Sequence, residues 1–245
     1  MRAALSCVAL AAAGTPLTAT EISRPRKLYL IAHACTRQVP GSDAALWQLN
    51  ELGSKQAAAL ARQPFWDEVD RLLLSCEPKT RLTVAPLLHR RDLPVEQDGR
   101  FDELHRTPEW TDDYTARVAE VFRRPRESIA GWEPAAAALN RFCEGIDDWA
   151  SRHPHDTMAL VGHGLTFSLY RAHLLGLPTV ALKDWQQLSF AAVACVQGGR
   201  FVEDFAVLPG VPHIPRGAAS PVVDPADDQL DGGQKEPGCP SAALE

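Results

Sequence analysis

Several features that would assign this sequence to common protein classes are missing from it. Its six cysteines form no Cys-x-x-Cys pair, which argues against a thiolate zinc site and against a disulfide scaffold. Basic residues are not in excess, because 31 Asp and Glu outnumber 25 Lys and Arg and the formal net charge is −6. We therefore expect no nucleic-acid partner. No apolar run is long enough for a helix that spans a membrane.

The remaining composition, 45% hydrophobic and 23% charged, is typical of soluble globular proteins. A chain of 245 residues is long enough for one well-buried core and short for two ordinary domains. We predict a central domain at 27–209, a leader or disordered extension at 1–26, and a disordered, acidic, Pro- and Gly-rich tail at 210–245. The tail lacks the apolar periodicity needed to offset the entropy of ordering, and holds six acidic and two basic residues.

The first 26 residues have the outline of a secretory signal peptide. Arg2 precedes an Ala-rich apolar stretch that runs from residue 3 to residue 13, and Ala19 is a possible cleavage position. An upstream extension from a misassigned start codon would look similar. We expect a cytoplasmic protein, with export as the alternative if residues 1–19 are a signal peptide.

Strand-like and helix-like segments alternate through the central domain. This alternation predicts an α/β three-layer sandwich, in which a mostly parallel sheet is covered by helices on both faces. In such sheets the ligand lies beyond the carboxyl ends of the strands. Apolar runs predict strands at 27–33, 69–75, 157–162 and 189–196, and helices are predicted at 52–62, 79–90, 114–122 and 133–150 and from the residues after 163 to 175.

Two of the predicted strands end in a histidine, His33 and His163. A histidine in this position stands at the ligand crevice of the sheet, and we expect Gly162 and Gly164 to let a substrate approach the backbone around His163. The alternative is that each ring only caps its strand through a backbone hydrogen bond. The presence of the pair, with its flanking glycines, favours a functional site.

Several short motifs carry a specific resemblance. His33 is followed by Thr36, and later motifs lie at 49–57, at 75–83 and at Trp132-Glu133, before His163-Gly164. In this order they resemble the histidine phosphatase (phosphoglycerate mutase-like) superfamily from about residue 27 to residue 196. The sequence departs from the family's Arg-His-Gly at the first motif, where Ala32 and Ala34 flank the histidine.

The resemblance implies roles for individual residues in phosphate-ester hydrolysis without a cofactor or metal. His33 would be the nucleophile that becomes a phosphohistidine, and His163 would stabilise the charge on the phosphoryl oxygens. Lys79 would take the place of a phosphate-binding arginine, with a point charge instead of a bidentate fork. Thr36 belongs to the same substrate-binding set, and the substrate would be a small phosphorylated molecule.

The leaving alkoxide needs a proton, which the family takes from an acid after the second strand-helix unit. Glu103 is the predicted acid, with Asp102 as the alternative. Loss of the arginine at position 32 would cost on the order of 2–4 kcal/mol of transition-state stabilisation unless another residue replaces it. Arg37 and Arg106 are the residues predicted to extend into the site and replace that charge.

Three alternative functions require different properties of the site. A phosphatase fold that binds a phosphorylated ligand or partner without turnover is favoured by Ala32 and disfavoured by the retention of both histidines. A phosphoglycerate-type mutase would have to retain and return the phosphoryl group. Metal-dependent hydrolysis would use His33, Cys35, His163 and Glu103, although the histidines lack paired ligand spacing.

Overall fold

The computed structural model describes residues 26–107, 111 and 113–217. The predicted leader up to residue 25 and the predicted tail from residue 218 onward lie outside the described residues. No helix within the described residues is long and apolar enough to cross a membrane.

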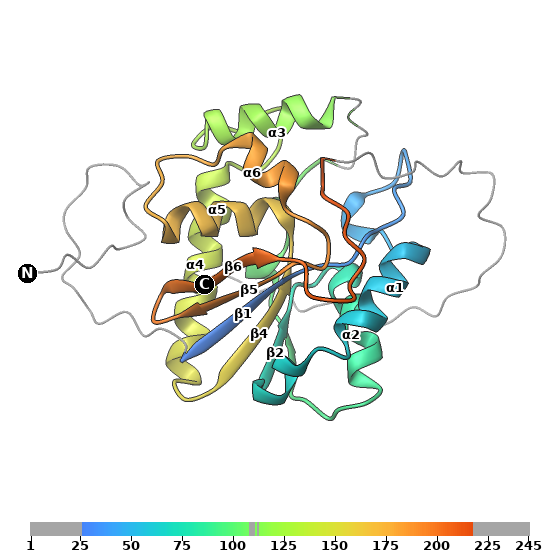
Figure 1. Ribbon diagram of the computed structural model, residues 1–245. Coiled ribbons are helices and arrows are strands. Elements are labelled where there is room, and N and C mark those ends of the chain that lie inside the picture. The colour runs from blue at the N-terminus through green and yellow to red at the C-terminus, as the bar shows by residue number, and fades with distance from the viewer. Residues whose placement is uncertain (1–25, 108–110, 112, 218–245) are drawn as a thin grey trace, which may run out of the picture.

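A six-stranded mixed sheet forms the centre of the domain (Figure 1), with the strand order β3-β2-β4-β1-β5-β6. The first four strands in this order run parallel to their neighbours, whereas β5 is antiparallel to β1 and β6 is antiparallel to β5. The sheet is thus mostly parallel, as predicted. The strands are β1 (Lys27–Ala32), β2 (Arg71–Leu74), β3 (Val95–Gln97), β4 (Thr157–Gly162), β5 (Val193–Gln197) and β6 (Arg200–Ala206).

Helices cover both faces of this sheet (Figure 1). One face carries α1 and α2, and the other carries α4 and α5, with α3 and α6 beyond α5. The helices are α1 (Glu51–Leu60), α2 (Pro78–Leu88), α3 (Tyr114–Arg123), α4 (Ala135–Arg152), α5 (Gly164–Leu174) and α6 (Leu182–Gln187). Short 3₁₀ turns lie at Ala44–Leu46, Pro64–Glu68 and Gly99–Phe101.

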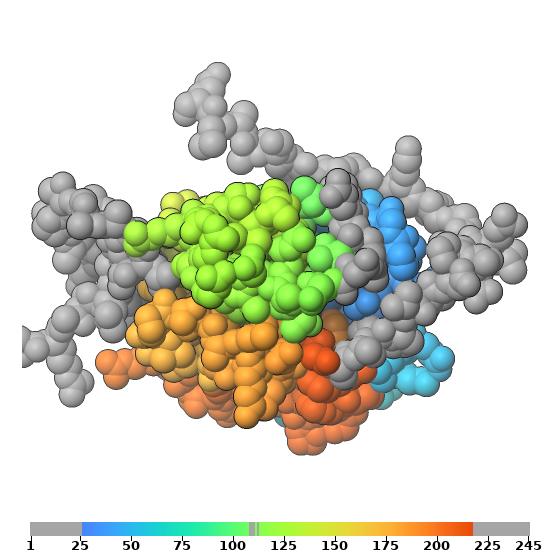
Figure 2. All heavy atoms as spheres, turned by 90° about the horizontal axis from the view of Figure 1, so that it is seen from above, coloured from blue at the N-terminus to red at the C-terminus, as the bar shows by residue number. Residues whose placement is uncertain are grey.

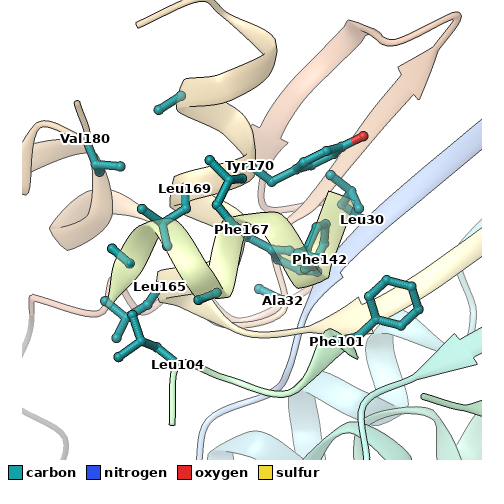
Figure 3. Close-up of a cluster of buried hydrophobic side chains, with 14 of the residues drawn as sticks. Leu30, Ala32, Phe101, Leu104, Phe142, Leu165, Phe167, Leu169, Tyr170 and Val180 are labelled. Carbon is teal, nitrogen blue, oxygen red and sulfur yellow. The ribbon is translucent and has the colours of Figure 1, made fainter. Parts of the chain in front are cut away.

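The alternation of side chains along β1 divides the core into two clusters. Tyr29 and Ile31 point to the cluster under α1 and α2, whereas Leu28, Leu30 and Ala32 point to the cluster under α4 and α5. Figure 3 shows Ala32 among the apolar side chains of that second cluster, and its own side chain has no exposed surface. Position 32 is therefore a packed core position.

Every helix and strand predicted up to residue 175 is present in the structure at about its predicted place. The structure adds β3, α6 and β6, and the strand predicted at 189–196 begins regular pairing only at Val193. Residues 210–217 correct the predicted domain boundary at 209. They lie against the domain, where Val211 is buried and Pro215 pairs with Ser189, so the domain extends at least to these residues.

Candidate active site

The carboxyl ends of β1 and β4 open into a cavity of about 270 Å³. Seen from above, the green segment that holds α3 lies beside the orange segment that holds α6, and the red-orange C-terminal segment adjoins both (Figure 2). The cavity is lined by two histidines, three cationic and two acidic side chains and several aromatic rings, among them His33, His163, Lys79, Arg106, Arg216, Asp43, Glu103, Trp47, Tyr114, Trp132, Trp185 and Phe190.

Strand pairing brings the two histidines together. Ala32 pairs with Gly162 in parallel register, so the next residue of each strand is His33 or His163. The His33 N–H donates to the Gly162 carbonyl at 2.9 Å, and the centroids of the two imidazole rings are 5.3 Å apart. Both rings line the cavity, as predicted from the ends of the strands.

The contacts of His33 define the protonation of its ring. Nδ1 lies 2.8 Å from the Ala34 carbonyl, which can only accept, so Nδ1 carries the hydrogen and Nε2 keeps its lone pair. Burial lowers the pKa of His33 well below its usual 6.5, and the nearby charges of Arg216, His163 and Lys79 act in the same direction. The site therefore holds a neutral imidazole with Nε2 available for attack.

His163 is held from the opposite side of the cavity. Its Nε2 lies 2.7 Å from Ser75 Oγ and 3.6 Å from Glu77 Oε1. Its Nδ1 is buried and has no hydrogen-bond partner among the described residues. Burial, followed by the charges of Lys79 and Arg216, lowers the pKa of His163 well below 6.5.

Lys79 enters the cavity from the first turn of α2, which begins with Pro78 in the position that needs no N–H partner. Its Nζ donates to the Ala44 carbonyl at 2.6 Å and to the Glu77 carboxylate. Burial lowers the pKa of Lys79, and the charge of Glu77 opposes this effect. Glu77 thus fixes Lys79 and borders His163, a double contact that was not predicted from the sequence.

Glu103 and Asp102 occupy different environments. The Glu103 carboxylate lines the cavity and accepts from the Leu165 and Thr166 N–H groups, at 2.9 and 3.1 Å, at the start of α5. Asp102 is absent from the cavity lining, and its Oδ1 accepts from the Cys76 N–H at 2.6 Å. Burial raises the pKa of Asp102 to about 6. Of the two predicted acids, only Glu103 is placed where a substrate would be.

Of the other predicted binding residues, two line the cavity and one does not. Thr36 and Arg106 line the cavity, and Arg106 Nη1 donates to the Tyr114 hydroxyl at 2.7 Å. The Arg106 guanidinium also lies 5.6 Å from the centroid of the Trp132 ring. Arg37 is absent from the cavity lining, and its N–H donates to the Gln48 carbonyl in the loop that follows β1.

Arg216 is a site residue that was not predicted, because it lies in the segment expected to be a disordered tail. Its Nη1 lies 3.5 Å from His33 Nε2, and its guanidinium stands 4.4 Å from the centroid of the Phe190 ring. Nε and Nη2 are buried and have no hydrogen-bond partner among the described residues. An arginine flanked by proline and glycine carries no local signal of this position.

The two glycines beside His163 serve a purpose different from the one predicted. A Cβ atom on Gly162 would stand 2.8 Å from the Phe167 ring, so this glycine makes room for core packing. A Cβ atom on Gly164 would stand 2.4 Å from Arg216 Nε. The space at both positions is therefore filled by side chains of this chain, and Gly164 gives room to the arginine.

The arrangement of possible metal ligands does not favour a metal centre. Within the residues that the structure describes, no group of three or more His, Cys, Asp or Glu side chains is arranged to hold a metal ion. Cys35 is a buried free cysteine, and Asn50 Nδ2 donates to its Sγ at 3.3 Å. The four ligands considered for a metal-dependent hydrolase do not come together as one cluster.

Comparisons with known proteins identify the family to which this chain belongs. Residues 28–204 match the family described as the histidine phosphatase superfamily (branch 1). The chain is 27% identical over 162 residues to Phosphoserine phosphatase 1 of Hydrogenobacter thermophilus, covering 61% of this chain and 76% of that protein.

Solved structures share the fold at lower identity. YhfR of Bacillus stearothermophilus superposes with a TM-score of 0.62 at 20% identity, covering 76% of this chain and 99% of that chain. A mycobacterial glucosyl-3-phosphoglycerate phosphatase in complex with VO3 gives a TM-score of 0.61 at 21% identity, covering 75% and 98% of the two chains. At these identities the likeness shows a common fold.

Proposed function

The chain belongs to the histidine phosphatase superfamily, and on that premise we propose that it hydrolyses phosphate monoesters through a phosphohistidine on His33. The state of the His33 ring is the observation that carries this proposal. Its Nδ1–H is engaged by the Ala34 carbonyl, and burial lowers its pKa so that Nε2 presents a lone pair. A buried, neutral imidazole beside cationic side chains is suited to attack on an anionic phosphorus centre.

The reaction has two balanced steps. In the first, the Nε2 lone pair forms a bond to phosphorus while the ester P–O bond breaks, and the leaving alkoxide takes a proton from the Glu103 carboxyl group. In the second, water attacks the phosphohistidine, its proton passes to the Glu103 carboxylate, and the P–N bond breaks to release phosphate and restore His33. Covalent catalysis of this kind replaces one difficult displacement by two easier ones.

Glu103 would supply the proton for the first step from a fixed position in the site. Its carboxylate accepts backbone N–H groups at the start of α5 and is buried in the cavity wall. A phosphate monoester bound in the same cavity would lie next to this carboxyl group. The proton is then close to the ester oxygen that leaves.

The cations of the cavity serve the phosphoryl group. Lys79 is fixed by Glu77 and the Ala44 carbonyl, so its charge is already oriented before a ligand arrives. His163 lines the same cavity, and its buried Nδ1, which has no hydrogen-bond partner among the described residues, would donate to a phosphoryl oxygen in the tautomer that carries hydrogen there. Such preorganised donors act on the charge that develops in the transition state.

The substrate that fits is a small phosphorylated molecule. A cavity of about 270 Å³ leaves space for a phosphate and a compact organic part. Tyr114 packs against Trp132 and Trp185 in an aromatic part of the cavity lining. Two of the three similar proteins named above carry phosphatase names, which supports hydrolysis in preference to phosphoryl transfer back to a substrate.

A second candidate function is binding of a phosphorylated ligand without turnover. It is favoured by Ala32, since the residue before the nucleophile supplies no charge to the phosphoryl group. The same cavity and cations would serve it. The two candidates differ only in whether a covalent intermediate forms and is hydrolysed.

Both candidates are separated by one assay. The purified chain is incubated with an aryl phosphate and with a panel of natural phosphomonoesters between about pH 5 and 8, with EDTA present. We compare the parent with His33→Ala and with the control variant His213→Ala, whose exposed side chain is absent from the cavity lining. Hydrolysis in the parent and the control that is lost in His33→Ala supports the phosphatase.

The other outcomes of this assay are equally informative. If no ester is hydrolysed while calorimetry shows that the parent binds inorganic phosphate, the second candidate is supported. Hydrolysis that survives His33→Ala would show that another group is the nucleophile and would overturn the proposed mechanism.

A further inference from the structure

The chain around the nucleophile provides no cation of its own. Ala32 and Ala34 have no exposed surface, and Ala32 is packed in the core under α4 and α5 (Figure 3). A positive charge beside His33 must therefore come from another part of the chain. The structure brings one to within hydrogen-bonding range of Nε2 from residue 216, 183 positions along the sequence.

We propose that Arg216 binds the transferred phosphoryl group next to His33, so that the C-terminal segment completes the active site. This inference rests on the proposed function and names a further residue for the same reaction. Nη1 of Arg216 lies 3.5 Å from His33 Nε2, the atom that would attack phosphorus. A group bound at Nε2 is therefore within reach of the guanidinium.

The free donors of Arg216 point to an anionic ligand. Its Nε and Nη2 are shielded from solvent and have no hydrogen-bond partner among the described residues. Leaving buried guanidinium donors unsatisfied is costly, and a phosphoryl group supplies the acceptor oxygens they lack. The planar guanidinium offers parallel N–H groups that match two oxygens of a phosphate, which the ammonium of Lys79 cannot do.

Long-range contacts hold the segment that carries Arg216. Gln56 Nε2 donates to the Pro212 carbonyl at 2.8 Å, and the Ile214 backbone exchanges hydrogen bonds with Ser189 Oγ. The Arg216 N–H donates to the Leu188 carbonyl at 3.2 Å. The arginine therefore starts from a fixed backbone, which is what a preorganised phosphate donor needs.

The walls around the side chain also fit it. Phe190 presents its ring at 4.4 Å from the guanidinium carbon, an arrangement in which the cation is attracted to the ring face. On the other side, the missing Cβ of Gly164 leaves the space that the Arg216 Nε, Cδ and Cζ atoms occupy. A guanidinium enclosed in this way is directed at His33.

The test compares Arg216→Ala and Arg216→Lys with the parent and with His213→Ala, a control three residues away on the same segment. Hydrolysis of an aryl phosphate and inhibition by orthovanadate are measured, and the affinity for inorganic phosphate is measured by calorimetry without turnover. Removal of one preorganised donor of this kind costs about 10²–10³-fold. We expect that loss in kcat/KM and a parallel weakening of vanadate inhibition for Arg216→Ala.

Two further readouts separate a role in binding phosphate from a structural one. Arg216→Lys retains the charge without the fork and should recover part of the loss. Added guanidinium ion, well below concentrations that unfold the protein, should restore activity to Arg216→Ala and not to His33→Ala. Thermal unfolding of each variant shows whether the fold is intact.

The outcomes distinguish this inference from the proposed function. If the parent hydrolyses the ester and folded Arg216→Ala keeps its kcat/KM and its vanadate inhibition, the role of Arg216 is wrong and the phosphatase stands. If the parent has no turnover but binds phosphate, and Arg216→Ala loses that binding, the role of Arg216 stands and the phosphatase fails. If the parent neither hydrolyses esters nor binds phosphate, both are overturned.

Discussion

Substitution of Gly164 by alanine tests the site through a single methyl group. An ideal Cβ at this position would stand 2.4 Å from Arg216 Nε and 2.7 Å from both Cδ and Cζ. Carbon and nitrogen atoms that are not hydrogen-bonded normally approach to about 3.5 Å, so the arginine side chain must move by roughly 1 Å. Gly164→Ala therefore displaces the guanidinium from His33 without removing its charge.

The expected effect is large on turnover and small on stability. A displacement of about 1 Å in a positioning group costs up to about 10²-fold in rate, and we expect kcat/KM for an aryl phosphate to fall by that order. Gly164 is the first residue of α5, where alanine is a better helix former than glycine. The displaced atoms belong to the end of a flexible side chain, so Tm should not fall.

A double-mutant cycle decides whether the methyl group acts through the arginine. In the Arg216→Ala background the added Cβ has no guanidinium to displace, so Gly164→Ala should have no further effect on kcat/KM. If the losses in kcat/KM of the two substitutions add, the methyl group does not act by displacing Arg216. Gly164 would then leave room for the substrate itself. A fall in Tm of Gly164→Ala alone would show that the methyl group disturbs the start of α5 instead.

Two other predictions follow from the same geometry. Burial lowers the folded-state pKa of His163 below its unfolded value of about 6.5, so the unfolded chain takes up a proton first and stability is lost as pH falls below 6.5. We measure the unfolding free energy by urea titration at several pH values below about 6.5. His163→Gln should reduce its slope against pH by up to about 1.4 kcal/mol per pH unit. An unchanged slope would contradict the lowered pKa of His163. Glu103→Gln should slow an alkyl phosphate by about 10²–10⁴-fold and an aryl phosphate with a good leaving group much less; equal losses for both esters would exclude Glu103 as the proton donor.

The elements that position the histidines were predictable because their signals are local. The runs that form β1 and β4 are apolar after their first residue, and every residue of β4 is buried, so both strands are evident from hydrophobicity. Parallel strands that end in histidine then bring the two rings to one edge of the sheet. The prediction of a site at His33 and His163 follows from this without any long-range information.

The missed elements lack such signals. β6 lies at the edge of the sheet and has only half-buried or exposed residues, with Phe201 and Phe205 as its half-buried aromatic positions. Three residues in β3 and six in α6 are too few for a periodic pattern. Short or edge elements of this kind are defined by tertiary contacts, which the local sequence does not contain.

Arg216 was unpredictable for a related reason. Residues 210–217 form no helix or strand, and their Pro and Gly content is also that of a disordered tail. What orders them is distant in sequence, since Gln56 and Ser189 bind their backbone groups. The sequence shows that Ala32 stands where the family has an arginine. It does not show which distant residue lies near His33, and the replacement was therefore predicted to be Arg37 or Arg106.

The electrostatics of the cavity link the state of the nucleophile to the binding of phosphate. Burial lowers the pKa of His33, and the charges of Arg216 and Lys79 lower it further, so His33 is neutral before phosphate enters and needs no separate deprotonation. The same two cations attract the phosphate dianion, whose charge then offsets theirs next to His163. A bound anion would make proton uptake at His163, which lines the same cavity, easier. In the proposed mechanism Arg216 would therefore serve two purposes, because its charge adds to the effect of burial in lowering the pKa of His33 and its guanidinium would hold the phosphoryl group.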